Sequence, residues 1–282
     1  MRAMKTDEAA AAPSVTAAAN RLARASSTGK PCPPVADLIG PSDIARAYAV
    51  QQVTTERRLA AGARIIGRKI GLTSSAVQAQ IGVDRPDFGA LFDDMRYGDG
   101  ELIPYQRLLQ PKAEGEVAFL LGHDIPDASD PAAIRVAVHL AYPAVEIVDS
   151  RIENWHIGIT DTVADNASSG VFVIGDRGRP VDEFDPVRVQ MVMRRGGEVV
   201  SRGTGQDCLG DPMHALTWLA RTAIEFGSPL RAGDLVLSGA LGPMVTAGPG
   251  DVFEVSIEPL GTVTAHFSDN PGPAGRAGKD NG

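Results

Sequence analysis

Hydrophobic and polar positions alternate with a period of two over much of the chain, and this period is typical of β-strands. Between 187 and 194, Val189, Met191 and Met193 fall on one face, and Gly196-Gly197 predicts a hairpin turn into a partner strand at 198–201. Further strands are predicted where apolar or alternating runs occur, at 65–70, 112–121, 144–151, 171–174, 234–239, 253–257 and 262–267.

Helical periodicity is confined to a few segments. Asp43 is a suitable N-cap residue and Gly62 a suitable stop, and between them lie residues at helical spacing: Ile44, Tyr48, Gln52, Thr55 and Leu59. A second helix is predicted over 211–226 from its apolar stripe of Met213, Leu216, Leu219, Ala220 and Ala223. Shorter helices are predicted at 17–25, 74–81 and 131–141.

These elements predict the class and organisation of the fold. Strands and helices do not alternate regularly, which argues against a doubly wound parallel sheet. We expect an α+β protein with a small, mainly helical N-terminal part (1–64) and a mixed β-rich domain (65–267). Residues 268–282 are rich in Gly, Pro and charge, and we expect them to form a disordered tail.

Composition excludes several classes of partner. The net charge of −8 over 282 residues argues against a nucleic-acid-binding protein, which requires a basic face. The sequence contains no apolar run near the roughly 20 residues that span a bilayer, so we expect no membrane partner. Two cysteines in unrelated contexts suggest a reducing, cytoplasmic location.

Three glutamates suggest a metal site. Glu114 and Glu116 lie two residues apart in a predicted strand, so their side chains share one face, and Glu146 lies within a second apolar strand. A glutamate is rarely buried without a partner, and hard divalent cations prefer oxygen ligands. We therefore hypothesise that the three carboxylates meet around one Mg²⁺ or Mn²⁺. The alternative is a solvated strand face that binds nothing.

Two further residues and one loop are candidates for chemistry. Lys69 lies between apolar and glycine neighbours, which fits either a lysine in a pocket or an edge-strand lysine that prevents aggregation. Asp87 lies in a loop with turn chemistry, where it either caps the chain or faces a site. Residues 161–170 are predicted to form a polar loop, either an ordinary turn or a binder of an anion.

Six motifs occur in an order that resembles a known family. They are 67–74 (GRKIGLTS), 86–89 (PDFG), 114–116 (EGE), 146–151 (EIVDSR), 164–170 (ADNASSG) and 237–245 (LSGALGPMV). Together they are similar to the 2-keto-4-pentenoate hydratase family, which is part of the fumarylacetoacetate hydrolase superfamily. The resemblance covers the chain from about Ala17 to Phe267.

The resemblance implies a fold, a metal and a reaction. It implies a fumarylacetoacetate-hydrolase-like β-rich domain in a homo-oligomer, with Mg²⁺ or Mn²⁺ held by Glu114, Glu116 and Glu146. It also implies hydration of a small-molecule 2-hydroxy-2,4-dienoate to a 4-hydroxy-2-oxo acid in the meta-cleavage catabolism of aromatic compounds. Four residues are then expected in the site: Lys69 and Asp87 for proton transfer or water positioning, and Leu72 and Ser168 for substrate binding.

Three alternatives stay open from the sequence. A 4-oxalocrotonate-type decarboxylase has a similar metal site but must receive a second carboxylate, which Arg68 or Arg85 could bind. A Schiff-base lyase would use Lys69 as a nucleophile without a metal. A scaffold protein would leave the glutamates as ordinary surface charge.

Overall fold

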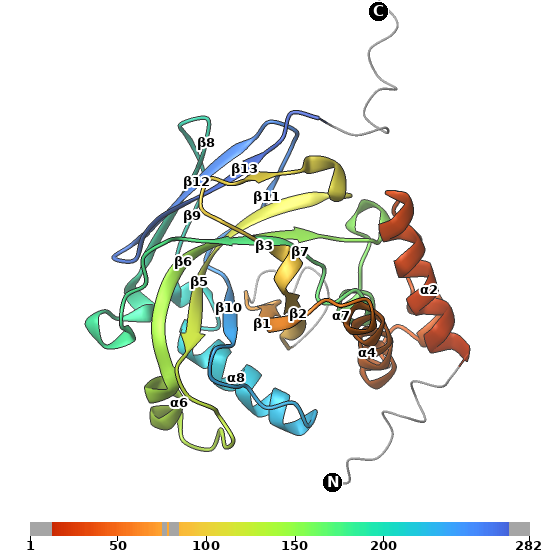
Figure 1. Cartoon of the computed structure of the whole chain (residues 1–282), viewed down its shortest axis with the longest axis horizontal. Helices are drawn as coiled ribbons and strands as arrows, with labels where there is room; N and C mark the ends of the chain where they lie inside the picture. Colours follow the sequence, from red (N-terminus) through yellow and green to blue (C-terminus); the bar gives the residue numbers. More distant parts are fainter. Residues whose placement is uncertain (1–12, 75–77, 79–84, 271–282) are drawn as a thin grey trace, which may run out of the picture.

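The computed structural model describes residues 13–74, 78 and 85–270 (Figure 1). Most of the helix predicted at 74–81, and the tail from 271 onward, lie outside the described residues. The helices are α2 (Pro13–Thr28), α3 (Ala36–Ile39), α4 (Ile44–Ala60), α6 (Pro131–Ala137), α7 (Ile159–Ala164) and α8 (Pro212–Glu225).

The strands form two mixed sheets, and the α+β class expected from the sequence is confirmed. The larger sheet has the order β2-β1-β10-β5-β6-β7-β3, with β11 also paired to β5, and the smaller has the order β4-β13-β12-β8-β9. Larger-sheet strands are β1 (Ile65–Gly71), β2 (Asp87–Phe92), β3 (Arg96–Tyr97), β5 (Pro111–Leu121), β6 (Val138–Asp149), β7 (Ser169–Ile174), β10 (Leu235–Ala240) and β11 (Val245–Thr246). Smaller-sheet strands are β4 (Leu102–Ile103), β8 (Gln190–Arg195), β9 (Glu198–Thr204), β12 (Val252–Glu258) and β13 (Gly261–Phe267).

The two sheets enclose the main hydrophobic core. Long strands β5 and β6 pair antiparallel through the centre of the larger sheet, and their side chains alternate between two buried faces. One face packs against the smaller sheet, where Val117 and Phe119 join Val255 and Phe253 in a single cluster. The other face carries the polar residues described below.

The N-terminal helices pack together beside the end of the larger sheet (Figure 1). Asp43 caps α4 by accepting a hydrogen bond from the backbone N–H of Arg46 at 3.0 Å. Val15 and Leu22 of α2 share a buried cluster with Val50 of α4 and Val163 of α7. The helix predicted at 17–25 is confirmed and is longer, since it begins at Pro13 and ends at Thr28.

Three local predictions are wrong. Asp87 was expected in a loop, but it is the first residue of strand β2, where it pairs with Gly71 of β1. The helix predicted over 131–141 ends at Ala137, because Val138 and Leu140 pair with β5 as the first residues of β6. The first four residues of the loop predicted over 161–170 belong to helix α7, which ends at Ala164. Asp161 stabilises this helix by accepting a hydrogen bond from the Gly158 N–H at 2.9 Å.

Candidate active site

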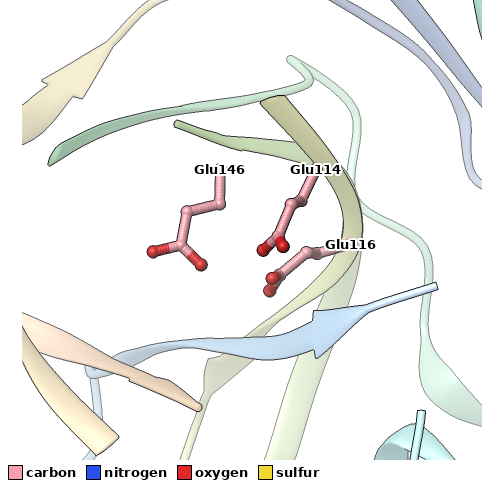
Figure 2. A group of neighbouring side chains, drawn as sticks. All are labelled: Glu114, Glu116 and Glu146. Carbon is pink, nitrogen blue, oxygen red and sulfur yellow. The ribbon is translucent and has the colours of Figure 1, made fainter. Parts of the chain in front are cut away.

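Three glutamates meet on one face of the larger sheet (Figure 2). Glu114 of β5 lies directly opposite Glu146 of β6 in the antiparallel register, and Glu116 follows two residues later on the same face. Carboxylate oxygens from the three residues lie within 4.8 Å of one another. The side chains are 8%, 0% and 1% exposed for Glu114, Glu116 and Glu146, which rules out a solvated strand face.

The electrostatics of this cluster favour a bound cation. Burial, together with repulsion from the neighbouring glutamates, raises the pKa of Glu114 to about 7 and that of Glu116 well above its usual range. Burial also raises the pKa of Glu146, and Lys69 opposes this rise. Within the described part of the chain, Glu116 Oε1 and Glu146 Oε2 have no hydrogen-bond partner. Buried carboxylate oxygens without partners are the donor set that Mg²⁺ and Mn²⁺ prefer, so the residues fit such an ion.

Lys69 extends from β1 into the same cluster. Its Nζ lies 3.1 Å from Glu146 Oε1 and donates a hydrogen bond to the Ala167 carbonyl at 3.0 Å. Burial lowers the pKa of Lys69, but Glu146, Asp87, Glu114 and Glu116 outweigh it and raise the pKa overall. Without a bound cation, the cluster thus holds Lys69 as an ammonium ion. The sequence interpretation assumed instead that a neighbouring cation lowers the pKa of Lys69.

Asp87 faces Lys69 from the neighbouring strand β2. It is 1% exposed, and burial raises its pKa although Lys69 and Thr162 oppose the rise. Its Oδ2 accepts a hydrogen bond from Thr162 Oγ1 at 2.9 Å, while Oδ1 has no partner among the described residues. A Cβ atom at Gly71 would lie 2.2 Å from Asp87 Oδ1 and 3.4 Å from Lys69 Nζ. The absence of a side chain at Gly71 therefore keeps open the space between the two groups.

A cavity of about 150 Å³ lies over these residues. Five of the residues predicted from the sequence line it, namely Lys69, Leu72, Asp87, Glu114 and Ser168. The other two predicted residues, Glu116 and Glu146, do not line it and join it through Glu114 and Lys69. The structure therefore brings all seven candidates together.

An unusual turn forms one wall of the cavity. Asn166, Ala167 and Ser168 have φ values of 55°, 52° and 50°, in the left-handed region that non-glycine residues rarely adopt. The Asn166 side chain holds this turn against β2, since its Oδ1 accepts from the Ala90 N–H at 2.7 Å and its Nδ2 donates to the Ala90 carbonyl at 2.9 Å. The turn presents the Ala167 carbonyl to Lys69, and it buries Ser168 Oγ without a partner among the described residues.

Among the lining residues that the sequence interpretation did not assign to the site are Lys112 and Trp155. Lys112 is partly buried, and its Nζ lies 4.3 Å from the centre of the Trp155 ring. Burial lowers the pKa of Lys112, although Glu114 opposes this change. Lys112 precedes Glu114 by two residues in β5, so the period of two that placed the glutamates on one face also places Lys112 there.

The two arginines proposed to bind a second carboxylate do not line the cavity. Arg68 donates instead to Ser228 Oγ at 3.0 Å and to the Gly67 carbonyl at 3.1 Å. Among the described residues that line the cavity, Lys112 is the cationic side chain present in addition to Lys69.

Comparison with known proteins places the chain in a family. Residues 65–268 match the model of the fumarylacetoacetate (FAA) hydrolase C-terminal domain. The chain is 53% identical to 2-keto-4-pentenoate hydratase 2 of Dechloromonas aromatica over 89% of this chain and 97% of that protein. It is 52% identical to 2-keto-4-pentenoate hydratase of Paraburkholderia xenovorans over 90% of this chain and 94% of that protein.

A solved structure supports the same relationship. The 4-oxalocrotonate decarboxylase of Pseudomonas putida G7, in complex with magnesium and adipate, superposes with a TM-score of 0.86 and 32% identity, over 95% of this chain and all of that one.

No helix in the described parts of the chain has the length and apolar character needed to cross a membrane. The chain belongs to the 2-keto-4-pentenoate hydratase family of hydro-lyases, within the fumarylacetoacetate hydrolase superfamily.

Proposed function

We propose that the cavity is the active site of a metal-dependent hydratase that converts a 2-hydroxy-2,4-dienoate to a 4-hydroxy-2-oxo acid in the meta-cleavage catabolism of aromatic compounds. One observation carries the proposal: a three-glutamate cluster, Lys69 and Asp87 converge at one small cavity in a chain 53% identical to a hydratase. The cavity of about 150 Å³ suits a short, unbranched acid.

Glu114, Glu116 and Glu146 are proposed to hold Mg²⁺ or Mn²⁺. When bound, the cation supplies positive charge that polarises the 2-oxo group and offsets the carboxylates around Lys69. Such an ion takes about six oxygen ligands, so the three carboxylates would leave room for oxygen atoms of the substrate. Magnesium in the related decarboxylase structure supports this assignment.

Two groups on the cavity wall are proposed to bind the substrate carboxylate. Lys112 contributes positive charge from the strand that carries Glu114, and Ser168 contributes a buried hydroxyl group. Leu72, at φ 57°, contributes an apolar surface for the hydrocarbon chain. Together they orient the dienoate along the cavity, with its C2 oxygen near the glutamates.

Lys69 and Asp87 are proposed to move the protons. The Lys69 ammonium ion gives a proton to C5, while the Asp87 carboxylate, whose pKa is raised by burial, takes the proton of the 2-hydroxyl group. The product of this step is the 2-oxo-3-enoate. Water then adds its oxygen to C4 and returns a proton to Lys69, and Asp87 gives its proton to C3. One water is consumed, and both side chains end as they began.

The competing reactions have less support. A decarboxylase of 2-oxo dioates needs a cation for a distal carboxylate, but Arg68 and Arg85 do not line the cavity and identity to the decarboxylase is 32%. A Schiff-base lyase needs a free lysine amine, whereas Lys69 is paired with Glu146 and bonded to Ala167. A cytoplasmic location and a homo-oligomer remain predictions.

The test is a spectroscopic assay with 2-hydroxypenta-2,4-dienoate, with and without Mn²⁺ or Mg²⁺, beside the same assay with 4-oxalocrotonate. Metal-dependent loss of the dienoate absorbance, with 4-hydroxy-2-oxopentanoate as product, would support the hydratase. Turnover of the dioate alone, with release of CO₂, would assign the decarboxylase. A product trapped on Lys69 by borohydride in metal-free protein would assign the Schiff-base lyase.

A further inference from the structure

A second and larger cavity, of about 550 Å³, lies on the other side of the turn that follows α7. Its walls come from α2, α4, the segment after β2, and the ends of β6 and β7, and α2, α4 and α7 lie side by side at that end of the molecule (Figure 1). The volume falls within the range of roughly 300–1,000 Å³ that is typical of small-molecule sites. Neither the proposed hydratase reaction nor the metal cluster uses this cavity.

The charges around this second cavity are unbalanced. Four arginines line it, Arg57, Arg58, Arg107 and Arg151, against two aspartates, Asp94 and Asp165. This excess of positive charge occurs in a chain whose net charge is −8, so it is a local feature and does not reflect the composition of the chain.

One of the four arginines is held in place by the protein. Arg151 donates through Nε to Asp165, through one terminal nitrogen to the Ser169 carbonyl at 2.6 Å, and through the other to the Asp165 carbonyl at 2.5 Å. Three of its five N–H donors are thus used within the protein, and Arg151 supports the cavity wall.

Two of the remaining three arginines share a single carboxylate. Arg58 pairs with Asp94, and Arg107 Nη2 lies 3.7 Å from the same side chain. Arg57 forms no ion pair with any residue that the structure describes. The Arg58 guanidinium also stacks on Phe92 at 3.9 Å, which fixes the orientation of its plane. Burial lowers the pKa of Arg58, Asp94 opposes this, and Arg107 and Arg151 add to the lowering, as expected for neighbouring positive charges.

We propose that this cavity is a second binding site, which takes a small dianion bearing carboxylate or phosphate groups through Arg57, Arg58 and Arg107. Guanidinium groups bind both kinds of oxyanion with paired hydrogen bonds. Ser26 of α2 and Thr55 of α4 line the same space and add hydroxyl groups that can donate to an anion.

The two cavities are separated by one short segment. Asp165, Asn166 and Ser169 line the arginine cavity, whereas Ala167 and Ser168 line the active-site cavity. The dianion site is therefore distinct from the metal cluster, and its occupation is measurable in metal-free protein that has no hydratase activity.

The test is calorimetric titration of metal-free protein with inorganic phosphate and, separately, with succinate. We expect saturable binding of at least one anion to the wild type, and at least tenfold weaker binding to an Arg57→Gln/Arg107→Gln variant. Arg188→Gln, at an exposed site outside the lining of this cavity, and Lys112→Gln, in the active-site cavity, should bind as the wild type does. A preference for phosphate or for succinate identifies which oxyanion the site takes.

Two results would overturn the proposal. The first is no saturable binding of either anion to the wild type. The second is binding that Lys112→Gln removes and the arginine variant keeps, which would place the anion in the active-site cavity. If the double variant fails to fold, Arg57→Gln alone serves, because Arg57 is exposed and forms no ion pair among the described residues.

Discussion

Replacing Glu146 by Gln should remove the stabilisation of the protein by Mn²⁺. Gln has nearly the same size as Glu, so the variant keeps the packing at a position that is 1% exposed. It loses one negative charge, and one of its side-chain oxygens becomes an amide NH₂ group that cannot bind a cation. Because Glu146 lies directly opposite Glu114, the change falls at the centre of the cluster.

The size of the effect follows from the linkage between binding and folding. At a Mn²⁺ concentration 100 times the dissociation constant, binding stabilises the native state by about 2.7 kcal/mol. Each kcal/mol shifts the melting temperature of a chain of this size by about 2–4 °C, so the wild type should gain roughly 5–10 °C. If the variant binds Mn²⁺ 100-fold more weakly, the stabilisation falls to about 0.4 kcal/mol and the gain to roughly 1 °C.

Differential scanning calorimetry with and without Mn²⁺ measures this gain for each protein against its own metal-free form. That reference is needed because Gln at 146 also breaks the buried ion pair with Lys69 and alters the metal-free stability. Glu198→Gln is the matched control, since Glu198 is exposed at the start of β9 and should leave the gain unchanged. A Glu146→Gln protein that keeps the full wild-type gain would refute the metal site.

Four further outcomes test the proposed roles. The melting-temperature gain from Mn²⁺ should be larger at pH 8 than at pH 6. The pKa of Glu114 in the metal-free fold is raised to about 7, so the stability that Glu114 contributes is present at low pH and is lost as pH rises through 7, where bound Mn²⁺ restores it. An equal gain at both pH values would contradict this. Lys69→Met should lower kcat by about 10²–10⁴-fold in the absorbance assay while keeping the Mn²⁺ gain, and unchanged turnover would remove Lys69 from the mechanism. Gly71→Ala should lower kcat/KM by about 10²-fold, because its Cβ would lie 2.2 Å from Asp87 Oδ1 and displace that group; normal kinetics would show that the space is not used. Lys112→Met should raise KM about tenfold with little change in kcat, as expected for the loss of one carboxylate contact, and an unchanged KM would exclude that contact.

The parts of the site that lie on regular strands could be predicted from the sequence. A period of two places Glu114 and Glu116 on one face whatever the surrounding fold, and the cost of burying Glu146 alone predicts a partner for it. The hairpin at Gly196-Gly197 followed from local turn chemistry, and the helix over 211–226 followed from its apolar stripe.

Features that depend on long-range contacts could not be predicted. Val138 and Leu140 continue a helical pattern in sequence, but pairing with β5 recruits them into a strand. The left-handed conformation of Asn166 is disfavoured locally and persists because its side chain bonds to both backbone groups of Ala90, which lies 76 positions away in the chain. The stacking of Lys112 on Trp155 joins a strand to a loop after β6 in the same way.

The N-terminal helices complete the active site although they contribute no residue to its cavity. Gln51 of α4 is buried, and its Nε2 donates at 2.9 Å to the carbonyls of both Phe88 and Val163. Phe88 follows Asp87 in the chain, and Val163 follows Thr162, whose hydroxyl bonds to Asp87. One amide group thus fixes the spacing of the two segments that orient Asp87. The helical part therefore positions Asp87, one of the two residues proposed to transfer protons, through its packing against β2 and α7.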